Sequence, residues 1–277
     1  MDRVPIRGTG KAGEGRVLAV VIWLIPLAVV VCGAQHWLPP LASEHGAGID
    51  RMLVYLLVTV GGLLTLGHLA LGYSIWRFSG QPRVTHRLAS PRQERKWALI
   101  PILLMTVIGE GGVFVLGMPV WAKFYAASPP DDALPVEITA EQFAWNVRYP
   151  GPDGVLGRTD AQMIRLNNPL GLDPDDPAAR DDVVLVNELF LPVNRPARVR
   201  LRSKDTLHSF FLPNLRVKQD AVPGMTIELW FVPTETGSYE IACTELCGFG
   251  HYQMRGLLQV LTGPEFETRM RELPPFR

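Results

Sequence analysis

Twelve residues near the C-terminal end of the chain carry an unusual set of metal-binding side chains. The stretch CTELCGFGHYQM holds Cys243, Cys247, His251 and Met254, and a further imidazole, His208, lies 35 residues before the first cysteine. Thiolate, imidazole and thioether together are the ligands of soft or borderline metals, above all copper. Zinc would use the cysteines and histidines but has little use for the methionine. The residue types and their spacing therefore favour a copper site.

A disulfide is the simpler interpretation of the two cysteines, because a C-x-x-x-C spacing allows one in an oxidising compartment. It does not explain the histidine and the methionine at these spacings. A mononuclear blue-copper site uses a single thiolate, so the second thiolate favours two copper ions bridged by both sulfurs, with one histidine on each. An electron shared by two ions changes their geometry little. We therefore expect electron transfer rather than substrate chemistry, and we assign no catalytic acid or base.

The parts of the chain that must position this loop differ in composition. Residues 1–125 carry 12 basic and 6 acidic side chains and residues 126–277 carry 15 and 21, although the formal net charge of the whole chain is zero. This balance excludes a disordered chain and a basic nucleic-acid binder, so we expect no nucleic-acid partner. With only three cysteines, a disulfide-dense scaffold is excluded as well. A membrane-anchored part followed by a soluble domain remains.

Three apolar runs are each long enough to span a membrane as a helix: Val17–Trp37, Met52–Trp76 and Trp97–Ala122. The loop over residues 77–96 holds six basic side chains against Glu94 alone. The positive-inside rule makes this loop cytoplasmic and places the C-terminal part on the outer side. We therefore expect a signal peptide or additional transmembrane helix in residues 1–37, a helical hairpin in 38–125 with helices at about 52–76 and 97–122, and an outer domain in 126–277.

The first apolar run allows two interpretations, because a basic start before an apolar stretch is also the layout of a signal peptide. The basic residues are Arg3, Arg7, Lys11 and Arg16, and cleavage would follow Ala34. Both alternatives leave the C-terminal domain outside. Two polar residues, His68 and Glu110, interrupt the later runs. We interpret Glu110 as a neutral group hydrogen-bonded to a partner subunit, since intramembrane ionisable side chains usually face protein.

From Leu134 onward the pattern changes to short β-type runs between turns, which predicts an antiparallel sandwich or barrel. The predicted strands are Val136–Thr139, Phe143–Tyr149, Val183–Leu191, Ala197–Ser203, Ser209–Leu212, Thr226–Val232, Gly237–Cys243 and Leu257–Leu261. An aspartate-rich loop runs from Gly151 to Asp182. We interpret it as a solvated surface loop, with an acidic docking face for a basic partner as the alternative.

The copper loop resembles that of cytochrome c oxidase subunit II, C-x-E-x-C-x-x-x-H-x-x-M, and the resemblance extends over roughly Pro40 to Gly263. Other matching segments are WALIP at 97–101, QFAW at 142–145, LPVN at 191–194, LHSFFLP at 207–213 and VKQDAVPG at 217–224. The resemblance implies a protein of the bacterial inner membrane. It implies two or three transmembrane helices followed by an all-β, cupredoxin-like Greek-key domain on the periplasmic side.

The resemblance also implies the site residues. The two cysteines would bridge the two copper ions of a CuA centre, the two histidines would be terminal ligands, the methionine a weak sulfur ligand, and the glutamate would supply a backbone carbonyl. The implied metal ligands are thus His208, Cys243, Glu245, Cys247, His251 and Met254. The side chain of Glu245, supported by Asp220, would help to hold magnesium at the interface with subunit I. Glu94 matches an acid at the mouth of a proton path.

One position departs from the family pattern. Phe143 stands where the family usually has the tryptophan that receives electrons from cytochrome c, and only Trp145 remains nearby. Phenylalanine lacks the indole N–H and some contact area. We therefore expect electrons to arrive through Phe143 and Trp145, from an unusual donor or in an unusual docking pose.

The implied function is that of subunit II of a bacterial aa3-type-like cytochrome c oxidase. Its CuA centre would accept electrons from a periplasmic cytochrome c and pass them to haem in subunit I, where O2 is reduced and protons are pumped. A subunit III is a further expected partner. Haem is expected only in the partner, because the chain has no C-x-x-C-H for a fused cytochrome c. The alternatives are the CuA subunit of a nitric oxide reductase and a stand-alone membrane-tethered copper chaperone or electron carrier. A quinol oxidase subunit would lack the copper ligands.

Overall fold

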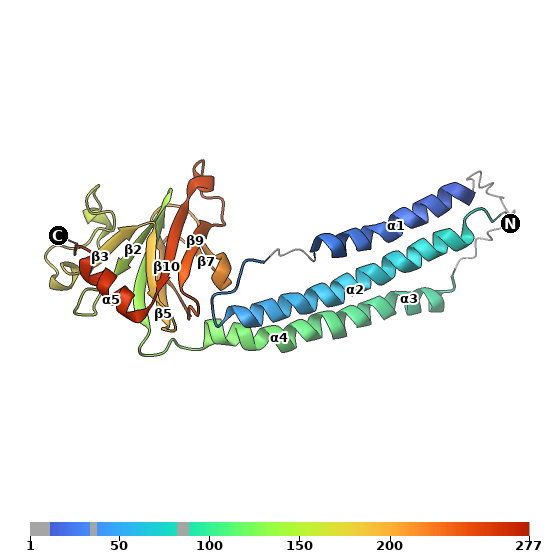
Figure 1. Ribbon diagram of the computed structural model, residues 1–277, viewed down its shortest axis with the longest axis horizontal. Coiled ribbons are helices and arrows are strands. Elements are labelled where there is room, and N and C mark those ends of the chain that lie inside the picture. Colours follow the sequence, from blue (N-terminus) through green and yellow to red (C-terminus); the bar gives the residue numbers. More distant parts are fainter. Residues whose placement is uncertain (1–11, 34–37, 82–88, 277) are drawn as a thin grey trace. The chain divides into compact units, whose positions relative to one another are not determined.

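The computed structural model describes residues 12–33, 38–81 and 89–276. The expected cleavage position and several basic residues used for the orientation lie outside the described residues; these are Ala34, Arg3, Arg7, Lys11, Arg83 and Arg87. The chain divides into two compact units. One comprises Met1–Leu38 with Asp50–Met118, and the other comprises Pro39–Ile49 with Pro119–Arg277. The first is helical and the second is built mainly of strands (Figure 1).

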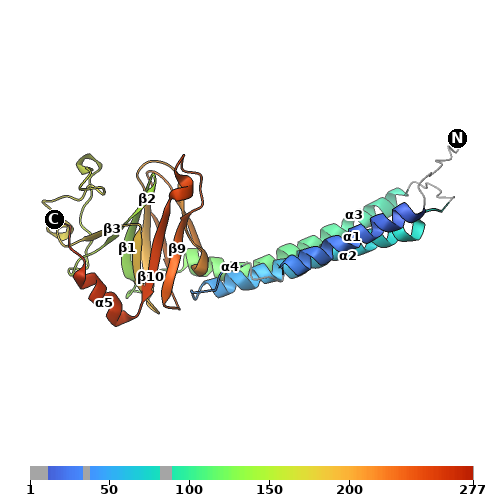
Figure 2. The same ribbon diagram turned by 45° about the horizontal axis from the view of Figure 1, so that its top comes forward.

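The apolar runs form three helices that are long and apolar enough to cross a membrane. They are α1 (Ala12–Gly33), α2 (Gly46–Phe78) and a composite helix over Pro91–Ala126. The composite helix contains α3 (Pro91–Leu104), a π-helical turn (Met105–Glu110), α4 (Gly111–Trp121) and a second π-helical turn (Ala122–Ala126). Figure 2 shows these helices from a second side. The later two extend beyond the apolar runs at 52–76 and 97–122 into polar flanking sequence.

Contacts within the helical unit join its helices. The indole Nε1 of Trp23 donates to the carbonyl of Leu69 over 3.2 Å, and its ring stacks on Trp76 with centroids 5.8 Å apart. The Tyr55 hydroxyl donates to the carbonyl of Ile108 in the π-helical turn. Backbone groups released by such a turn need another partner in lipid, so Tyr55 satisfies a carbonyl that the regular helix would have used.

The two ionisable residues inside the spans have different surroundings. His68 Nδ1 lies 2.8 Å from the carbonyl of Leu64, one turn earlier in the same helix. Glu110 ends the first π-helical turn and makes no hydrogen bond or ion pair within the part of the chain that the structure describes. The local contact satisfies the histidine ring within its own helix.

Ten strands of the second unit form two five-stranded sheets that pack face to face, which confirms the predicted all-β sandwich. One sheet has the order β3-β2-β1-β5-β8 and the other β4-β10-β9-β6-β7. The strands are β1 (Leu134–Glu141), β2 (Ala144–Tyr149), β3 (Val183–Val186), β4 (Glu188–Pro192), β5 (Ala197–Ser203), β6 (His208–Leu212), β7 (Val217–Ala221), β8 (Ile227–Phe231), β9 (Gly237–Cys243) and β10 (Arg255–Leu261). Helix α5 (Gly263–Glu272) follows β10.

Alternation along the strands decides which side chains enter the core. In β5, Ala197, Val199 and Leu201 are buried while Arg198 and Arg200 point outward. β1 pairs in parallel with β5, in register with these residues, and contributes further buried aliphatic side chains. Parallel pairing needs a long crossover rather than a hairpin, and here the chain from β2 to β4 supplies it. The core therefore draws on strands that are distant in sequence.

Two strands differ from the sequence prediction. The run Val183–Leu191 was predicted as one strand, but it is split at Asn187, which has a φ of 61°, into β3 and β4 in different sheets. Asparagine tolerates this left-handed conformation better than most residues. Strand β7 was not predicted, because its sequence VKQDA has too few apolar residues for an alternating pattern. It pairs with β6 at the edge of the second sheet.

The segment Pro39–Ile49 belongs to the β unit by its contacts. Ser43 forms an isolated bridge with Pro233, and its hydroxyl donates to the carbonyl of Leu215 over 2.6 Å. His45 is buried between the rings of Phe124 and Trp230, each with its centroid 4.6 Å away. Neither imidazole nitrogen has a hydrogen-bond partner, and burial lowers the pKa of His45 to about 4. A neutral ring therefore fills this position.

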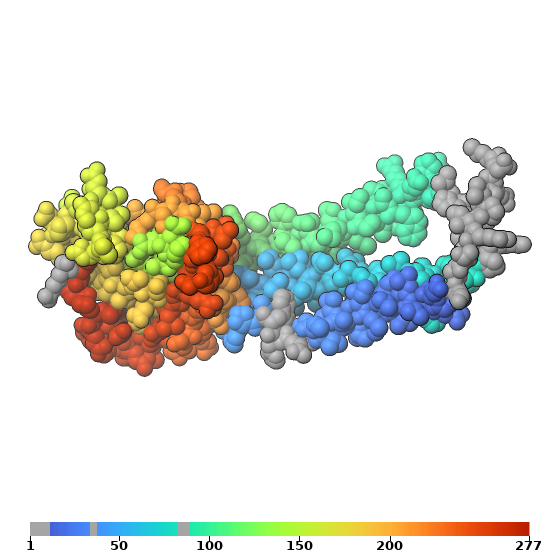
Figure 3. Space-filling view, turned by 90° about the horizontal axis from the view of Figure 1, so that it is seen from above, coloured from blue at the N-terminus to red at the C-terminus, as the bar shows by residue number. Residues whose placement is uncertain are grey.

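The aspartate-rich loop between β2 and β3 lies against the outer face of the first sheet and forms a lobe, yellow-green to yellow in Figure 3. Arg148 is almost fully buried and pairs with Glu137 at 2.9 Å and with Asp182 at 3.0 Å. Burial raises the pKa of Asp182 to about 6, against the lowering effect of Arg148. Further out, Arg158 pairs with Asp173 at 3.0 Å. Several of the acids thus pair with arginines of the loop or of the sheet and hold the loop in place.

Candidate metal centre

Neighbouring strand ends bring the predicted ligands together. His208 is the first residue of β6 and Cys243 the last residue of β9, and these strands pair antiparallel. The chain then passes through Cys247 and a single 3-10 turn that begins at His251, and it reaches Met254 directly before β10. A distant histidine therefore joins the loop because β6 lies beside β9.

All six predicted ligand residues contribute to one cluster of donor atoms. The sulfurs of Cys243 and Cys247 are 3.8 Å apart. The remaining distances are 3.6 Å from Cys247 Sγ to His251 Nδ1, 3.7 Å from Cys247 Sγ to Met254 Sδ, 3.2 Å from His208 Nδ1 to Met254 Sδ, and 3.3 Å from Cys243 Sγ to the carbonyl oxygen of Glu245. Within the described residues, His208, Cys243 and Cys247 also stand out as a group whose ligand atoms lie within 4.8 Å of one another.

The donor set fits a copper pair better than it fits a disulfide. Both cysteines are free thiols, and their separation is far longer than the roughly 2.05 Å of an S–S bond. Burial, with the neighbouring Cys243 thiol, raises the pKa of Cys247 to about 11. Two buried thiolates so close together need a cation to offset their charge. Soft sulfur and imidazole donors around such a position suit copper.

Asp205 holds the imidazole of His208 in the orientation that the cluster needs. Its Oδ1 lies 2.8 Å from His208 Nε2, and its Oδ2 accepts from the backbone N–H of Gln142 over 2.7 Å. Burial raises the pKa of Asp205, but the hydrogen bonds outweigh this effect and lower it. With Nε2 occupied, Nδ1 is directed at the sulfurs. Sequence reasoning missed Asp205, although an acid three residues before the histidine was the available signal.

A second contact ties the ligand loop to the start of β2. Gln142 Nε2 donates to the carbonyl of Cys247 over 2.5 Å. The ring of Phe143 lies so close to Gly250 that a Cβ there would come within 2.5 Å of the ring. Gly248 has a φ of +141°, which side chains rarely adopt. The loop thus needs both glycines for the backbone to pass beneath Phe143.

The two residues predicted to receive electrons occupy different depths. Phe143 is partly buried against the ligand loop, whereas Trp145 has no exposed surface. The Trp145 ring centroid lies 6.3 Å from the ring of His208 and 5.4 Å from that of Phe210. An external donor would have to contact Phe143 or the loop, and Trp145 lies behind them.

Asp220, predicted for magnesium, and Glu94, predicted for a proton path, lie outside the copper ligand cluster, whereas Glu245 belongs to it through its backbone carbonyl. Asp220, on β7, accepts from the hydroxyl of Ser209 over 2.6 Å, one residue after His208. Within the described residues no hydrogen bond or ion pair joins Asp220 to Glu245. Glu94 lies in the first turn of α3, behind the N-cap Ser90.

Apolar helices attached to a β-sandwich that gathers two thiols, two imidazoles and a thioether define a membrane-anchored metal-binding protein of the redox type. Residues 135–261 match the family described as cytochrome c oxidase subunit II, periplasmic domain. The alternative cytochrome c oxidase subunit 2 of Bradyrhizobium diazoefficiens is 35% identical over 262 residues, covering 94% of this chain and 92% of that protein. The chain belongs to the cytochrome c oxidase subunit II family.

Two further proteins are similar to this chain. Cytochrome c oxidase subunit 2 of Cereibacter sphaeroides is 27% identical over 80% of this chain and 75% of its own length. Among solved structures, the periplasmic domain of subunit II of cytochrome oxidase of Bradyrhizobium japonicum is 30% identical and covers 53% of this chain and 96% of its own, with a TM-score of 0.39.

Family membership confirms several of the expectations. The β unit is a cupredoxin-like domain that follows transmembrane helices in the sequence, and the chain is a membrane protein. It is a component of an oxidase complex, in which subunit II is partnered by subunit I. The family's copper also agrees with the free thiols and the clustered donor atoms.

Proposed function

We propose that this chain receives single electrons from a periplasmic cytochrome c at a binuclear CuA centre and delivers them to haem in subunit I of an aa3-type-like oxidase. The observation that carries the proposal is the convergence of two free thiols, two imidazoles, a thioether and a backbone carbonyl from β6, β9 and the loop before β10. A pair of ions bridged by two sulfurs needs this donor set.

In the proposed centre, Cys243, Cys247, His208 and His251 would hold the copper. Met254 and the backbone carbonyl of Glu245 complete the ligand set. Bound copper would supply single-electron redox chemistry at this position. The protein keeps the ligands in place beforehand, which lowers the reorganisation that electron transfer requires.

The remaining residues of the site orient ligands and exclude water. Asp205 accepts a hydrogen bond from Nε2 of His208 and so keeps Nδ1 free to bind metal. Trp145 and Phe210 form an apolar wall beside the same ring. Phe143 covers the loop at Gly250. We assign Phe143 to the contact with the donor, and Trp145 to an interior position between that contact and His208.

Other features of the proposal concern the complex. Glu245 and Asp220 would support magnesium at the interface with subunit I, and Glu94 would lie at the mouth of a proton path. Subunit III would complete the assembly. The basic loop between α2 and α3 would face the cytoplasm of a bacterial cell, with the β domain on the periplasmic side of the inner membrane. The reaction of the complex would be that of cytochrome c oxidase, with the oxygen chemistry in subunit I.

The test uses the full chain purified with its complex in mild detergent. Two copper ions per chain and an electron paramagnetic resonance signal coupled to two equivalent copper nuclei are expected. Cys243→Ser should abolish this signal and the donor-driven oxygen uptake. Cys32→Ser is the matched control, because Cys32 is an exposed thiol in α1, and it should change neither.

One copper ion per chain with a mononuclear signal, or a Cys243–Cys247 disulfide in the freshly isolated protein, would contradict the binuclear centre. Isolation without any haem-containing partner, together with an intact signal, would support a stand-alone carrier instead. Reduction of nitric oxide in place of oxygen by the purified complex would move the chain to the nitric oxide reductase alternative.

A further inference from the structure

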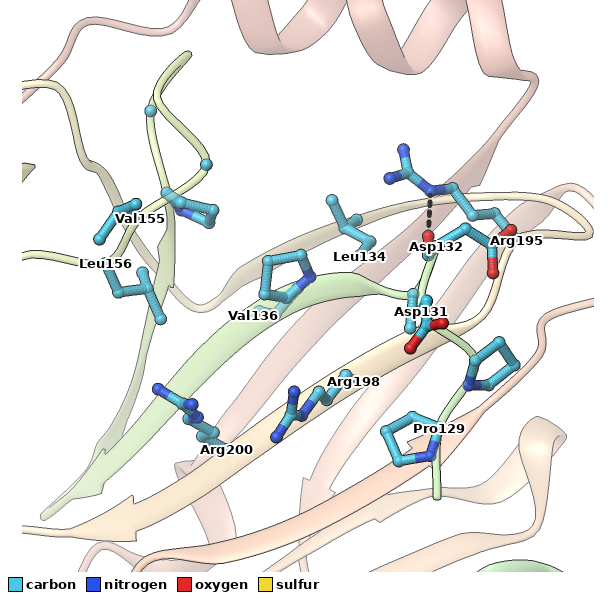
Figure 4. A pocket seen from close by; sticks show the side chains of 16 residues that line it. Pro129, Asp131, Asp132, Leu134, Val136, Val155, Leu156, Arg195, Arg198 and Arg200 are labelled. Carbon is cyan, nitrogen blue, oxygen red and sulfur yellow. Dashed lines mark hydrogen bonds between the residues drawn. The ribbon is translucent and has the colours of Figure 1, made fainter. Parts of the chain in front are cut away.

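A pocket of about 720 Å³ lies on the outer face of the first sheet, away from the copper ligands. It is lined by Arg195 just before β5, by Arg198 and Arg200 on β5, by the segment over residues 129–136 that leads into β1, and by residues between 150 and 156 after β2. In the view of Figure 4, Arg198 lies between Arg200 and Asp131. Neither the copper site nor the sandwich core uses these charged side chains.

One side of the pocket offers hydrogen-bond donors to an anion. Glu228 accepts from Arg198 at 2.9 Å and from Arg200 at 3.2 Å. The hydrogen bond from Arg198 is the main cause that lowers the pKa of Glu228, so this carboxyl is ionised. A single carboxylate between two guanidinium groups leaves one positive charge in excess. The Nε of Arg198 is buried and has no hydrogen-bond partner, although buried donors are nearly always satisfied.

The other side of the pocket offers acceptors to a cation. The carboxylates of Asp131 and Asp132 are exposed and make no hydrogen bond or ion pair within the described residues. Arg195 donates to the backbone carbonyl of Asp132 over 3.1 Å rather than to the Asp132 carboxylate. The pocket therefore has an end that can bind an anion and an end that can bind a cation. A ligand with a single charge would use only one of the two ends.

A short segment of the chain joins the pocket wall to the end of an apolar helix. The composite apolar helix ends at Ala126, and Pro129 in the pocket wall follows three residues later, within about 10 Å of fully extended chain. A second pocket of about 210 Å³ shares Arg198 and Pro129, and it is lined by Tyr125 and Trp230. Trp230 is buried against His45, whereas Tyr125 is exposed, and tyrosine concentrates at the depth of lipid headgroups.

We propose that this pocket binds a phospholipid headgroup that carries both a phosphate and a primary ammonium, as in phosphatidylethanolamine. The phosphate accepts from Arg198 and Arg200, and the ammonium donates to Asp131. The acyl chains leave along the exposed ring of Tyr125 into the leaflet that faces the β domain. A headgroup with only negative charge would meet the two aspartates, and a trimethylated ammonium has no N–H to donate to them.

The test uses the intact complex, stripped of lipid in detergent and then incubated with dioleoyl phosphatidylethanolamine, phosphatidylglycerol, phosphatidylcholine or inorganic phosphate. Native mass spectrometry counts the bound lipid, and the thermal midpoint is recorded alongside. The unaltered protein should retain phosphatidylethanolamine in preference to the other two lipids. Arg198→Gln should lower retention of every phospholipid about tenfold, the factor that corresponds to about 1.4 kcal/mol.

Asp131→Asn should remove the preference for phosphatidylethanolamine and leave phosphatidylglycerol binding unchanged or stronger. Because Asp131 is an exposed residue without partners, this variant keeps the test decisive if the arginine variant fails to fold. Arg255→Gln is the matched control: Arg255 is a highly exposed arginine on β10, in the other sheet, paired with Glu240 at 3.3 Å. Copper content, measured on each variant, reports that the β domain is intact.

Equal retention of the three lipids by the unaltered protein would overturn the proposal. So would lipid binding of the Arg198 and Asp131 variants that matches the Arg255 control. If inorganic phosphate alone raises the thermal midpoint as much as phosphatidylethanolamine does, the pocket is a site for free phosphate and the lipid assignment is wrong.

Discussion

Replacing Asp205 by asparagine tests how the fold prepares His208 to bind metal. The carboxylate accepts from His208 Nε2 at 2.8 Å with one oxygen and from the Gln142 N–H at 2.7 Å with the other. Asparagine has almost the same shape, but only one of its two terminal atoms is an acceptor. One of these two donors would therefore face an NH2 group. The imidazole would lose either its fixed orientation or the negative partner that makes it a better ligand.

The size of the effect follows from the bond that is lost. A hydrogen bond to a charged group contributes about 1.5–3 kcal/mol, which corresponds to roughly tenfold to a hundredfold in an equilibrium constant. Loss of comparable partners of metal-binding histidines lowers metal affinity by about 10–100-fold. We expect Asp205→Asn to weaken copper binding within this range. The reduction potential of the centre should rise, because removing a nearby negative charge destabilises the more positive, oxidised state.

Copper affinity is measured by competition with a chelator on the detergent-solubilised chain, and the potential by voltammetry. Glu240→Gln is the matched control, since Glu240 is an exposed carboxylate on β9, three residues before Cys243. The control should leave both quantities unchanged. If Asp205→Asn gives the copper affinity and the potential of the control, then the carboxylate does not orient the ligand and the reasoning is wrong.

Three further outcomes are expected. Burial lowers the pKa of His45 from 6.5 to about 4, so the folded state loses about 3 kcal/mol of stability as the pH falls from 6.5 to 4. The variant His45→Phe should not show this loss. If its profile of thermal midpoint against pH equals that of the unaltered protein, the reasoning is wrong. Gly250→Ala should weaken copper binding by pushing the loop away from the aromatic ring above it, whereas Gly263→Ala, whose Cβ meets no neighbour within 4 Å, should not. Removal of copper in air should let Cys243 and Cys247 form a disulfide, detected as loss of alkylation in mass spectrometry; continued full alkylation would count against their proximity.

The positions that sequence reasoning missed are those that reach the site through tertiary contacts. Gln142 lies 105 residues before Cys247, whose carbonyl it binds, and 63 residues before Asp205, which accepts from its backbone N–H. No local pattern announces such a contact. The break of a predicted strand at Asn187 was hidden for a related reason, because two adjacent strands in different sheets have the same residue preferences as one longer strand.

Two features depend on burial, which the residue types alone do not determine. The edge strand β7 carries a mostly polar sequence and forms because β6 offers it a partner. Trp145 was expected where electrons arrive, yet the alternation of β2 turns it into the core beside His208. Side-chain chemistry could be read from the sequence in both cases, but exposure depends on which neighbouring strands cover the residue.

The sequence by itself determined the kind of chemistry and the class of protein. Its evidence consists of local patterns, which can be recognised without knowing how the chain folds. These patterns are the three long apolar runs, the short alternating strands and the spacing of Cys243, Cys247, His251 and Met254. Only the tertiary structure decided that His208 joins this loop, that its Nδ1 faces the ligand sulfurs, and that Arg198 and Asp131 line one pocket on the first sheet. Those relations depend on strand order and register, which are set by packing the whole sandwich rather than by any one segment.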